Sequence, residues 1–106
     1  MYIVFITLRI LMNILERDQL EMFLSDHPDW EEDENGMLTA RFEFDRFLQA
    51  IDFVNQVAEE AEVMEHHPDI LIRYNEVTIS TCTHEADGMI TEKDIELVLR
   101  IEGLLE

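Results

Sequence analysis

Three histidines are the residues of this chain best suited to chemistry near neutral pH. His66 and His67 are adjacent, and His84 stands further along the chain. Imidazole titrates closest to neutrality of all side chains, so one ring can donate a proton while another accepts one. The three histidines therefore favour general acid–base catalysis. They do not predict a metal site, because the adjacent pair lacks the usual separation of two chelating ligands.

All three histidines are predicted to lie where a helix or a strand ends, which is where functional side chains are commonly displayed. His66 and His67 follow a predicted amphipathic helix that begins after Asp45, a candidate N-cap, and runs to about Glu65. His84 lies just past a predicted strand. In an antiparallel sheet backed by that helix, the two places can converge on one rim. The apolar positions that mark the helix are Phe47, Ile51, Val54, Val57, Ala58 and Ala61.

Two β-hairpins are predicted, one on each side of this helix. Asn35-Gly36 is a strong hairpin turn, and in the strand after it apolar and polar residues alternate. This alternation predicts a sheet with one buried and one solvated face. The predicted strands are 30–33, 38–44, 70–74 and 77–83, with the second turn at Asn75-Glu76.

Two further helices complete the predicted order. The first spans Leu11 to Leu24 and is ended by His27-Pro28, because the residue before a proline disfavours helical geometry. The last opens with a capping box at Thr91 and runs to about Leu105, with Asp94 expected to bind free amides at its start. The order α-β-β-α-β-β-α predicts an α+β fold. Its four-stranded antiparallel sheet would carry the three helices on one face.

Composition limits the partners of the protein. A chain of 106 residues has room for one domain, and a formal net charge of -18 disfavours direct contact with nucleic acid or a membrane surface. The three glycines form no phosphate-binding loop. The single cysteine, Cys82, excludes an internal disulfide and is typical of a reducing cytoplasm.

Residues 1–12 form an apolar N-terminal extension whose status is open. The run over 2–12 is about half as long as a membrane span and is interrupted by Arg9, and no small-residue cleavage site follows it. Two interpretations remain. The run packs on the body as an added element, or it precedes the true start of the protein at Met12.

The histidines belong to a longer pattern, which comprises Glu62, His66-His67-Pro68, Tyr74, His84 and Asp94. This pattern resembles the signature of the pterin-4a-carbinolamine dehydratases. The resemblance covers roughly residues 13 to 105 and includes ERDQL at 16–20, Trp30, the passage over 42–47 and TCTHE at 81–85. It implies that 13–106 is the dehydratase domain, while 1–12 have no counterpart. Trp30 and Tyr74 are expected in the core or an interface rather than on the pterin.

The resemblance implies an enzyme that removes water from 4a-hydroxytetrahydropterin and gives quinonoid dihydropterin, in the recycling of tetrahydrobiopterin. It also implies a homodimer or homotetramer, a pterin as small-molecule substrate and no cofactor. Dehydration needs a proton for the departing hydroxyl and the removal of one from a ring nitrogen. His66 and His84 are expected to exchange these protons, with the acid and base roles open, and His67 to bind and orient the pterin. The implied substrate-binding residues are Glu62, Glu65, Pro68, Cys82, Thr83 and Glu85.

A non-enzymatic function is the alternative. Relatives of this fold serve as dimerisation cofactors of a transcription factor or resemble assembly chaperones of a carbon-fixing enzyme. Retention of all three histidines favours the enzyme, because a pure binding module has no need of them. Glu65 and Cys82 depart from the residues usual in the family, which affects fine substrate preference more than the core reaction.

Overall fold

A four-stranded antiparallel sheet forms the centre of the structure, a computed structural model in which residues 12–106 are described. The strands follow one another in space in the order β1-β2-β4-β3, so the two hairpins join through β2 and β4. Trp30 pairs with Ala40 across the first hairpin, and Phe42 pairs with Val77 across the join. The strands are β1 (Trp30–Glu32), β2 (Leu38–Glu43), β3 (Asp69–Arg73) and β4 (Glu76–Thr81).

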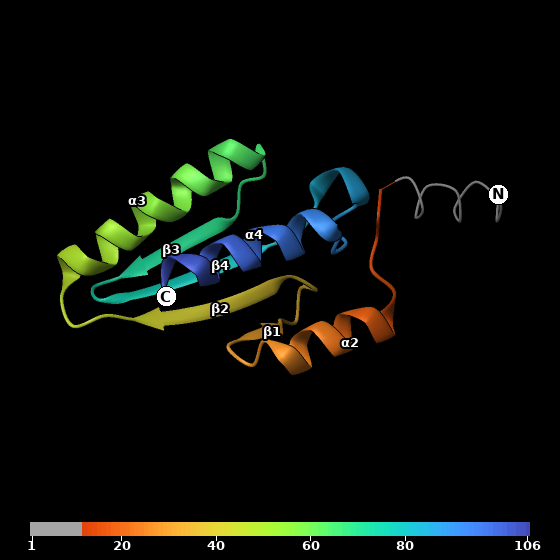
Figure 1. Ribbon diagram of the computed structural model, residues 1–106, viewed down its shortest axis with the longest axis horizontal. Coiled ribbons are helices and arrows are strands. Elements are labelled where there is room, and N and C mark those ends of the chain that lie inside the picture. The colour runs from red at the N-terminus through yellow and green to blue at the C-terminus, as the bar shows by residue number, and fades with distance from the viewer. Residues whose placement is uncertain (1–11) are drawn as a thin grey trace, which may run out of the picture.

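Three α-helices and one short 3₁₀ turn complete the architecture, in the predicted order (Figure 1). The helices are α2 (Arg17–Asp26), α3 (Phe47–Met64) and α4 (Glu92–Leu104), and the 3₁₀ turn is η1 (His84–Ala86). Figure 1 shows α3 and α4 running along the sheet and α2 beside β1. An ion pair of 2.7 Å between Arg17 and Glu32 joins α2 to β1.

All three helices pack on the same face of the sheet, as predicted. In β2 and β4 every second residue is buried, and the residues between them are half-buried or exposed. The buried residues of both strands belong to one core cluster with residues of α2, α3 and α4. Full burial of a Val, Leu or Ile side chain stabilises a fold by about 1.5–3 kcal/mol. The helical members of the core are Leu20, Ala50, Phe53, Val57, Ala61, Leu97, Val98 and Ile101.

Several predicted boundaries are wrong by a few residues. The first helix begins at Arg17, although its predicted start, Leu11, lies outside the described residues. Arg46, not Asp45, is the N-cap of α3, because the side chain of Gln49 folds back and accepts hydrogen bonds from both backbone amides. Local side-chain hydrogen bonds of this kind are not visible in apolar periodicity.

The second hairpin is shifted by one residue from its predicted place. Its turn is formed by Tyr74 and Asn75, and β4 ends at Thr81 rather than continuing to residue 83. The amide of Thr83 donates instead to the carbonyl of Met89 at 2.9 Å, as the chain turns into η1. His84 consequently lies in a turn that follows the strand, close to its predicted position.

The predictions for the N-terminal extension fall on residues 1–11, which lie outside the described part of the chain. Within residues 12–106, no helix has the length and apolar character needed to cross a membrane.

Candidate active site

Two adjacent histidines follow the C-terminal end of α3, and their side chains point in different directions. Glu65 follows the helix with φ 54° and ψ 39°, a left-handed conformation. Its amide donates to the carbonyl of Glu62, and the amide of His66 donates to that of Ala61. These two bonds form a Schellman motif, which reverses the chain direction at a helix end. His66 is only 6 % exposed as a result, whereas the side chain of His67 is 61 % exposed.

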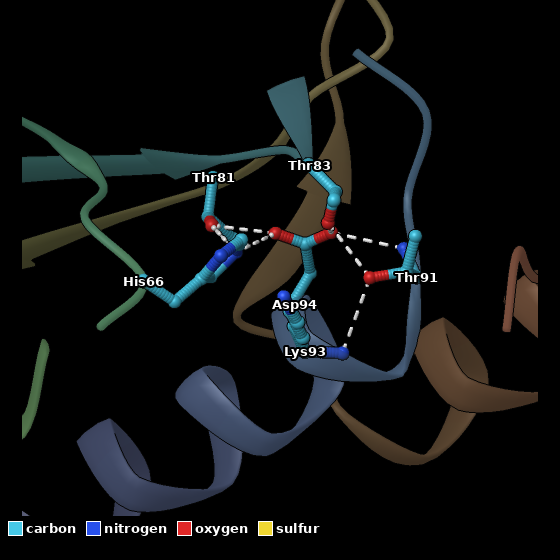
Figure 2. Close-up of polar contacts among 6 residues, drawn as sticks. All are labelled: His66, Thr81, Thr83, Thr91, Lys93 and Asp94. Atoms are coloured by element: carbon cyan, nitrogen blue, oxygen red, sulfur yellow. Dashed lines mark hydrogen bonds and ion pairs between the residues drawn. The ribbon is translucent and has the colours of Figure 1, made fainter. Parts of the chain in front are cut away.

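His66 points at a carboxylate that comes from the start of another helix. Its Nε2 lies 2.7 Å from Oδ1 of Asp94, which is completely buried in the first turn of α4 (Figure 2). Thr81, at the end of β4, donates its hydroxyl to the same oxygen at 2.7 Å. Thr83 donates to Oδ2 at 2.8 Å, and the amide of Thr91 donates to Oδ2 at 2.9 Å. Four groups, from the end of α3, the end of β4 and the start of α4, therefore meet on one carboxylate.

Asp94 does more than the sequence predicts of it. The predicted bond to a free amide at the helix start is confirmed by the contact with Thr91, the N-cap residue. The prediction missed that the carboxylate also binds His66 and two threonine hydroxyls. A buried carboxylate is costly unless its oxygens are satisfied, and these donors satisfy them. The sequence signal was present, since Asp94 belongs to the signature pattern, but its partners lie far away along the chain.

His67 has a carboxylate partner of its own. Its Nε2 lies 2.5 Å from Oε1 of Glu62, one turn back on α3. Both side chains are exposed to solvent. The pair adds little stability in water, and its groups are accessible to a ligand.

The segment of His84 reaches the same carboxylate through its neighbour. Thr83 is buried and precedes η1, while His84 and Glu85 are exposed in the first positions of this turn. Because Thr83 shares Asp94 with His66, the chain enters η1 from the place where His66 is held. Within residues 12–106 no side-chain hydrogen bond restrains His84 or Glu85. The structure therefore brings the two predicted histidine segments to one carboxylate and leaves two of the three histidines exposed.

Cys82 and Pro68 are packing residues rather than reactive ones. Cys82 is buried between Thr81 and Thr83, and burial, together with the negative charge of Asp94, raises the pKa of its thiol. A thiol of this kind is a small packing residue rather than a nucleophile. Pro68 is half-buried and separates His67 from β3.

The two aromatic residues of the pattern lie away from the histidines. Trp30 is 3 % exposed and packs edge-on against Phe42 at 6.0 Å, which confirms the expected core position. In the described part of the chain, its Nε1 is the only buried side-chain polar atom without a hydrogen-bond partner. Tyr74 is 70 % exposed in the turn at the other end of β3 from His66 and His67, so it does not lie in the core, and its place in an interface stays a prediction.

In the described part of the chain no metal cluster marks the site, and the cavity beside it is not lined by the histidines. Among residues 12–106, no group of three or more His, Cys, Asp or Glu side chains is arranged to hold a metal ion. A cavity of about 200 Å³ opens beside Thr83 and Thr91. Its lining includes none of the three histidines, so this cavity is not where they would act together.

Taken together, the fold and the site define a small α+β protein with acid–base groups at one end of its sheet. The family model described as pterin 4 alpha carbinolamine dehydratase matches residues 13–104. The chain belongs to this family.

Curated relatives and a solved structure agree with this assignment. A Gloeobacter violaceus protein is 46% identical over 89 residues, which cover 81% of this chain and 96% of that protein. A Mycobacterium leprae protein is 45% identical over 94 residues, covering 89% and 98%. Both are provisionally named pterin-4-alpha-carbinolamine dehydratases. A crystal structure described as a transcriptional coactivator/pterin dehydratase from Brucella melitensis superposes with a TM-score of 0.79 at 30% identity, over 86% of this chain and 97% of that one.

Proposed function

We propose that this protein dehydrates a 4a-hydroxytetrahydropterin by histidine acid–base catalysis. The observation that carries the proposal is the buried pair of His66 and Asp94, beside the exposed His67 and next to the segment of His84. The family of the chain makes a pterin the expected substrate.

In this reaction the C4a hydroxyl leaves as water and a ring nitrogen loses a proton, so one group must donate a proton and another accept one. His66 and His84 are the proposed pair, in either order of roles. Positioned groups of this type accelerate proton transfer by about 10²–10⁴-fold. No metal, nucleophile or electron carrier is needed for the atoms to balance.

The remaining site residues are proposed to hold the pterin. His67 and Glu62 present an imidazole and a carboxylate to solvent, which suits the hydrogen-bonding edge of a pterin ring. Backbone groups around Thr83 would read the donors and acceptors of the ring. The proposed substrate contacts are Glu62, Glu65, Pro68, Cys82, Thr83 and Glu85.

We also propose that the protein is a homo-oligomer that works in the cytoplasm in tetrahydrobiopterin recycling. The edge strand β3 supports self-association, because among residues 12–106 it pairs only with β4, and it carries the exposed side chain of Leu71. Its sequence DILIR is self-complementary. If two copies pair antiparallel about Leu71, Asp69 lies opposite the partner's Arg73 and the isoleucines face each other. This strip is electrically neutral on a chain of net charge -18, so pairing along it adds no like-charge repulsion of its own.

A protein-binding function is the second candidate. The Brucella melitensis relative is described as a coactivator as well as a dehydratase. The strongly acidic composition of this chain would suit a basic partner surface. Such a function needs the fold but not the histidines, so substitution of the histidines separates the two candidates.

The decisive assay generates 4a-hydroxytetrahydropterin in situ with an aromatic amino-acid hydroxylase and follows its dehydration by ultraviolet absorbance. The wild type is compared with His66→Ala, His67→Ala and His84→Ala. His27→Ala is the matched control. His27 lies at the C-terminal end of α2, where it binds Glu102 of α4, and it takes no part in the site. Acceleration that is lost in the three site variants and kept in the control supports the enzyme. A folded wild type without acceleration on several pterins would overturn it.

A further inference from the structure

The hydrogen bonds around Asp94 determine which nitrogen of His66 is free for chemistry. Nε2 lies 2.7 Å from Oδ1 of Asp94 and 3.4 Å from the hydroxyl oxygen of Thr81. An ionised carboxylate only accepts hydrogen bonds. The single proton of the Thr81 hydroxyl is committed to Asp94. Both neighbours of Nε2 are therefore acceptors, and Nε2 must carry a proton.

Oδ2 of Asp94 is the last acceptor in a chain of hydrogen bonds in which each group donates to the next. The amide of Lys93 donates to the hydroxyl of Thr91 at 3.2 Å, and Thr83 donates its hydroxyl to Oδ2 of Asp94 (Figure 2). The two threonine hydroxyls are 2.7 Å apart. Because the hydroxyl of Thr83 already donates its proton to Asp94, the hydroxyl of Thr91 must donate to that of Thr83. The network thus has one consistent arrangement of protons, which holds the carboxylate as an acceptor.

The second nitrogen of His66 is left without a protein partner. Nδ1 makes no hydrogen bond with any described residue. It is also not among the buried polar atoms that lack a partner, which in residues 12–106 comprise Trp30 Nε1 alone. Nδ1 therefore lies at the small part of the ring that solvent reaches.

We propose that Asp94 is the positioning residue of the site, which holds His66 as the Nε2–H tautomer so that Nδ1 is the atom that exchanges the proton with substrate. This inference rests on the proposed dehydratase function and deepens it. Thr81 and Thr83 hold the carboxylate in place, and Asp94 itself touches no substrate. A ring nitrogen bound to a carboxylate is the usual means by which proteins select a histidine tautomer.

Asp94→Asn is a sharp test, because the new amide can fit in only one orientation. The amide of Thr91 cannot turn away from position 94, so the oxygen of the asparagine must face it and the NH₂ group must face His66. The hydroxyl of Thr81 faces the same NH₂ group and can rotate to accept, whereas Thr83 still donates to the asparagine oxygen. Nε2 of His66 must then accept as well, and the ring changes to the Nδ1–H tautomer.

The experiment is long-range ¹H–¹⁵N correlation of histidine rings in the full-length protein, recorded at alkaline pH where the rings are neutral. We expect Nε2–H for His66 in the wild type and Nδ1–H in Asp94→Asn. We also expect kcat to fall by about 10²–10⁴-fold with KM little changed, since the group that is lost acts on the proton and not on binding.

Asp33→Asn is the matched control. Asp33 is also a turn carboxylate that accepts backbone amides, here of Asn35 and Met37, but it does not contact a histidine. Its substitution should leave the His66 tautomer and kcat unchanged. An Nδ1–H tautomer in the wild type overturns the inference even if no variant folds. An unchanged tautomer in Asp94→Asn, or a changed one with wild-type kcat, overturns it too. The spectra need no activity, so they separate this inference from the proposed dehydratase function.

Discussion

The carboxylate of Asp94 lies 2.7 Å from Nε2 of His66, although 28 positions separate the two residues in the chain. One belongs to the first turn of α4, and the other follows the last turn of α3. The contact joins the start of one helix to the end of another. It also couples helix capping to the orientation of the imidazole, because the carboxylate that binds the amide of Thr91 also binds His66.

Removal of the Asp94 side chain should destabilise the protein strongly. Asp94→Ala leaves two threonine hydroxyls, one amide and the Nε2–H of His66 without their acceptor in a buried place. We expect a loss of about 3–5 kcal/mol in the free energy of unfolding, measured by urea denaturation. Asp33→Ala, at a half-buried turn, should cost only about 1 kcal/mol. Equal losses in the two variants would contradict the network described for Asp94.

Substitution of Glu62 should affect substrate binding more than stability. Glu62→Gln removes the charge that faces His67, but both side chains are exposed, so the free energy of unfolding should change by less than about 0.5 kcal/mol. If the pair binds the pterin, KM rises and kcat changes less. Glu59→Gln, on an exposed position of the same helix, is the control and should alter neither constant. A fall in kcat alone would instead place Glu62 in the chemical step.

The left-handed backbone at Glu65 should make this position sensitive to residue type. A side chain at φ 54° is strained by about 1–2 kcal/mol, and asparagine tolerates this region better than glutamate. Glu65→Asn should therefore stabilise the protein by about 0.5–1 kcal/mol, whereas the branched side chain in Glu65→Val should destabilise it. Glu59→Asn, inside the helix, should have the opposite sign because asparagine is a weaker helix former. Thermal unfolding of the three variants checks this pattern.

The thiol of Cys82 should react slowly in the folded protein. Burial, assisted by the charges of Asp94, Asp69 and Asp33, raises the pKa of the thiol above its ordinary value of 9.0. The thiolate is the reactive form, so a chromogenic disulfide should label the native protein much more slowly than the protein in urea. Fast labelling of the native state would show that the side chain is accessible.

The same shift predicts how stability depends on alkaline pH. The unfolded chain loses the thiol proton first as pH rises. Above about pH 9 this ionisation therefore lowers the free energy of unfolding. The contribution of Cys82 to stability is complete below this pH and is lost as pH rises through the higher pKa of the folded state. Cys82→Ala should therefore show a smaller loss of stability between neutral and alkaline pH than the wild type. If the free energy of unfolding fell equally with pH in both proteins, the raised pKa of the Cys82 thiol would be contradicted.

Self-association through β3 can be tested by exchanging its two charges. Asp69→Arg places like charges opposite each other in the antiparallel pair centred on Leu71, so it should weaken the oligomer. The double variant with Asp69→Arg and Arg73→Asp restores opposite charges and should restore association. Sedimentation velocity measures the outcome. If neither variant changes the oligomeric state, the protein associates through another surface.

Local patterns in the sequence determined the elements of this fold and the residues proposed for its chemistry. The alternation in 38–44, the helical period before Glu65 and the capping box at Thr91 each depend on neighbouring residues, so they can be recognised without tertiary structure. The pattern of histidines, together with the family resemblance, likewise identified the family. Errors of one or two residues occurred where a single side chain, such as Gln49, decided a boundary.

Only the tertiary structure decided where each of these residues lies and which groups it contacts. No local pattern in the sequence predicts different burial for the two adjacent histidines, but the Schellman motif at Glu65 buries one and exposes the other. Asp94 looks like an ordinary capping residue until the packing of α4 brings it to His66, Thr81 and Thr83. These contacts join segments that are distant along the chain. They exist because the core packs the ends of α3, β4 and α4 together, and no local propensity encodes that meeting.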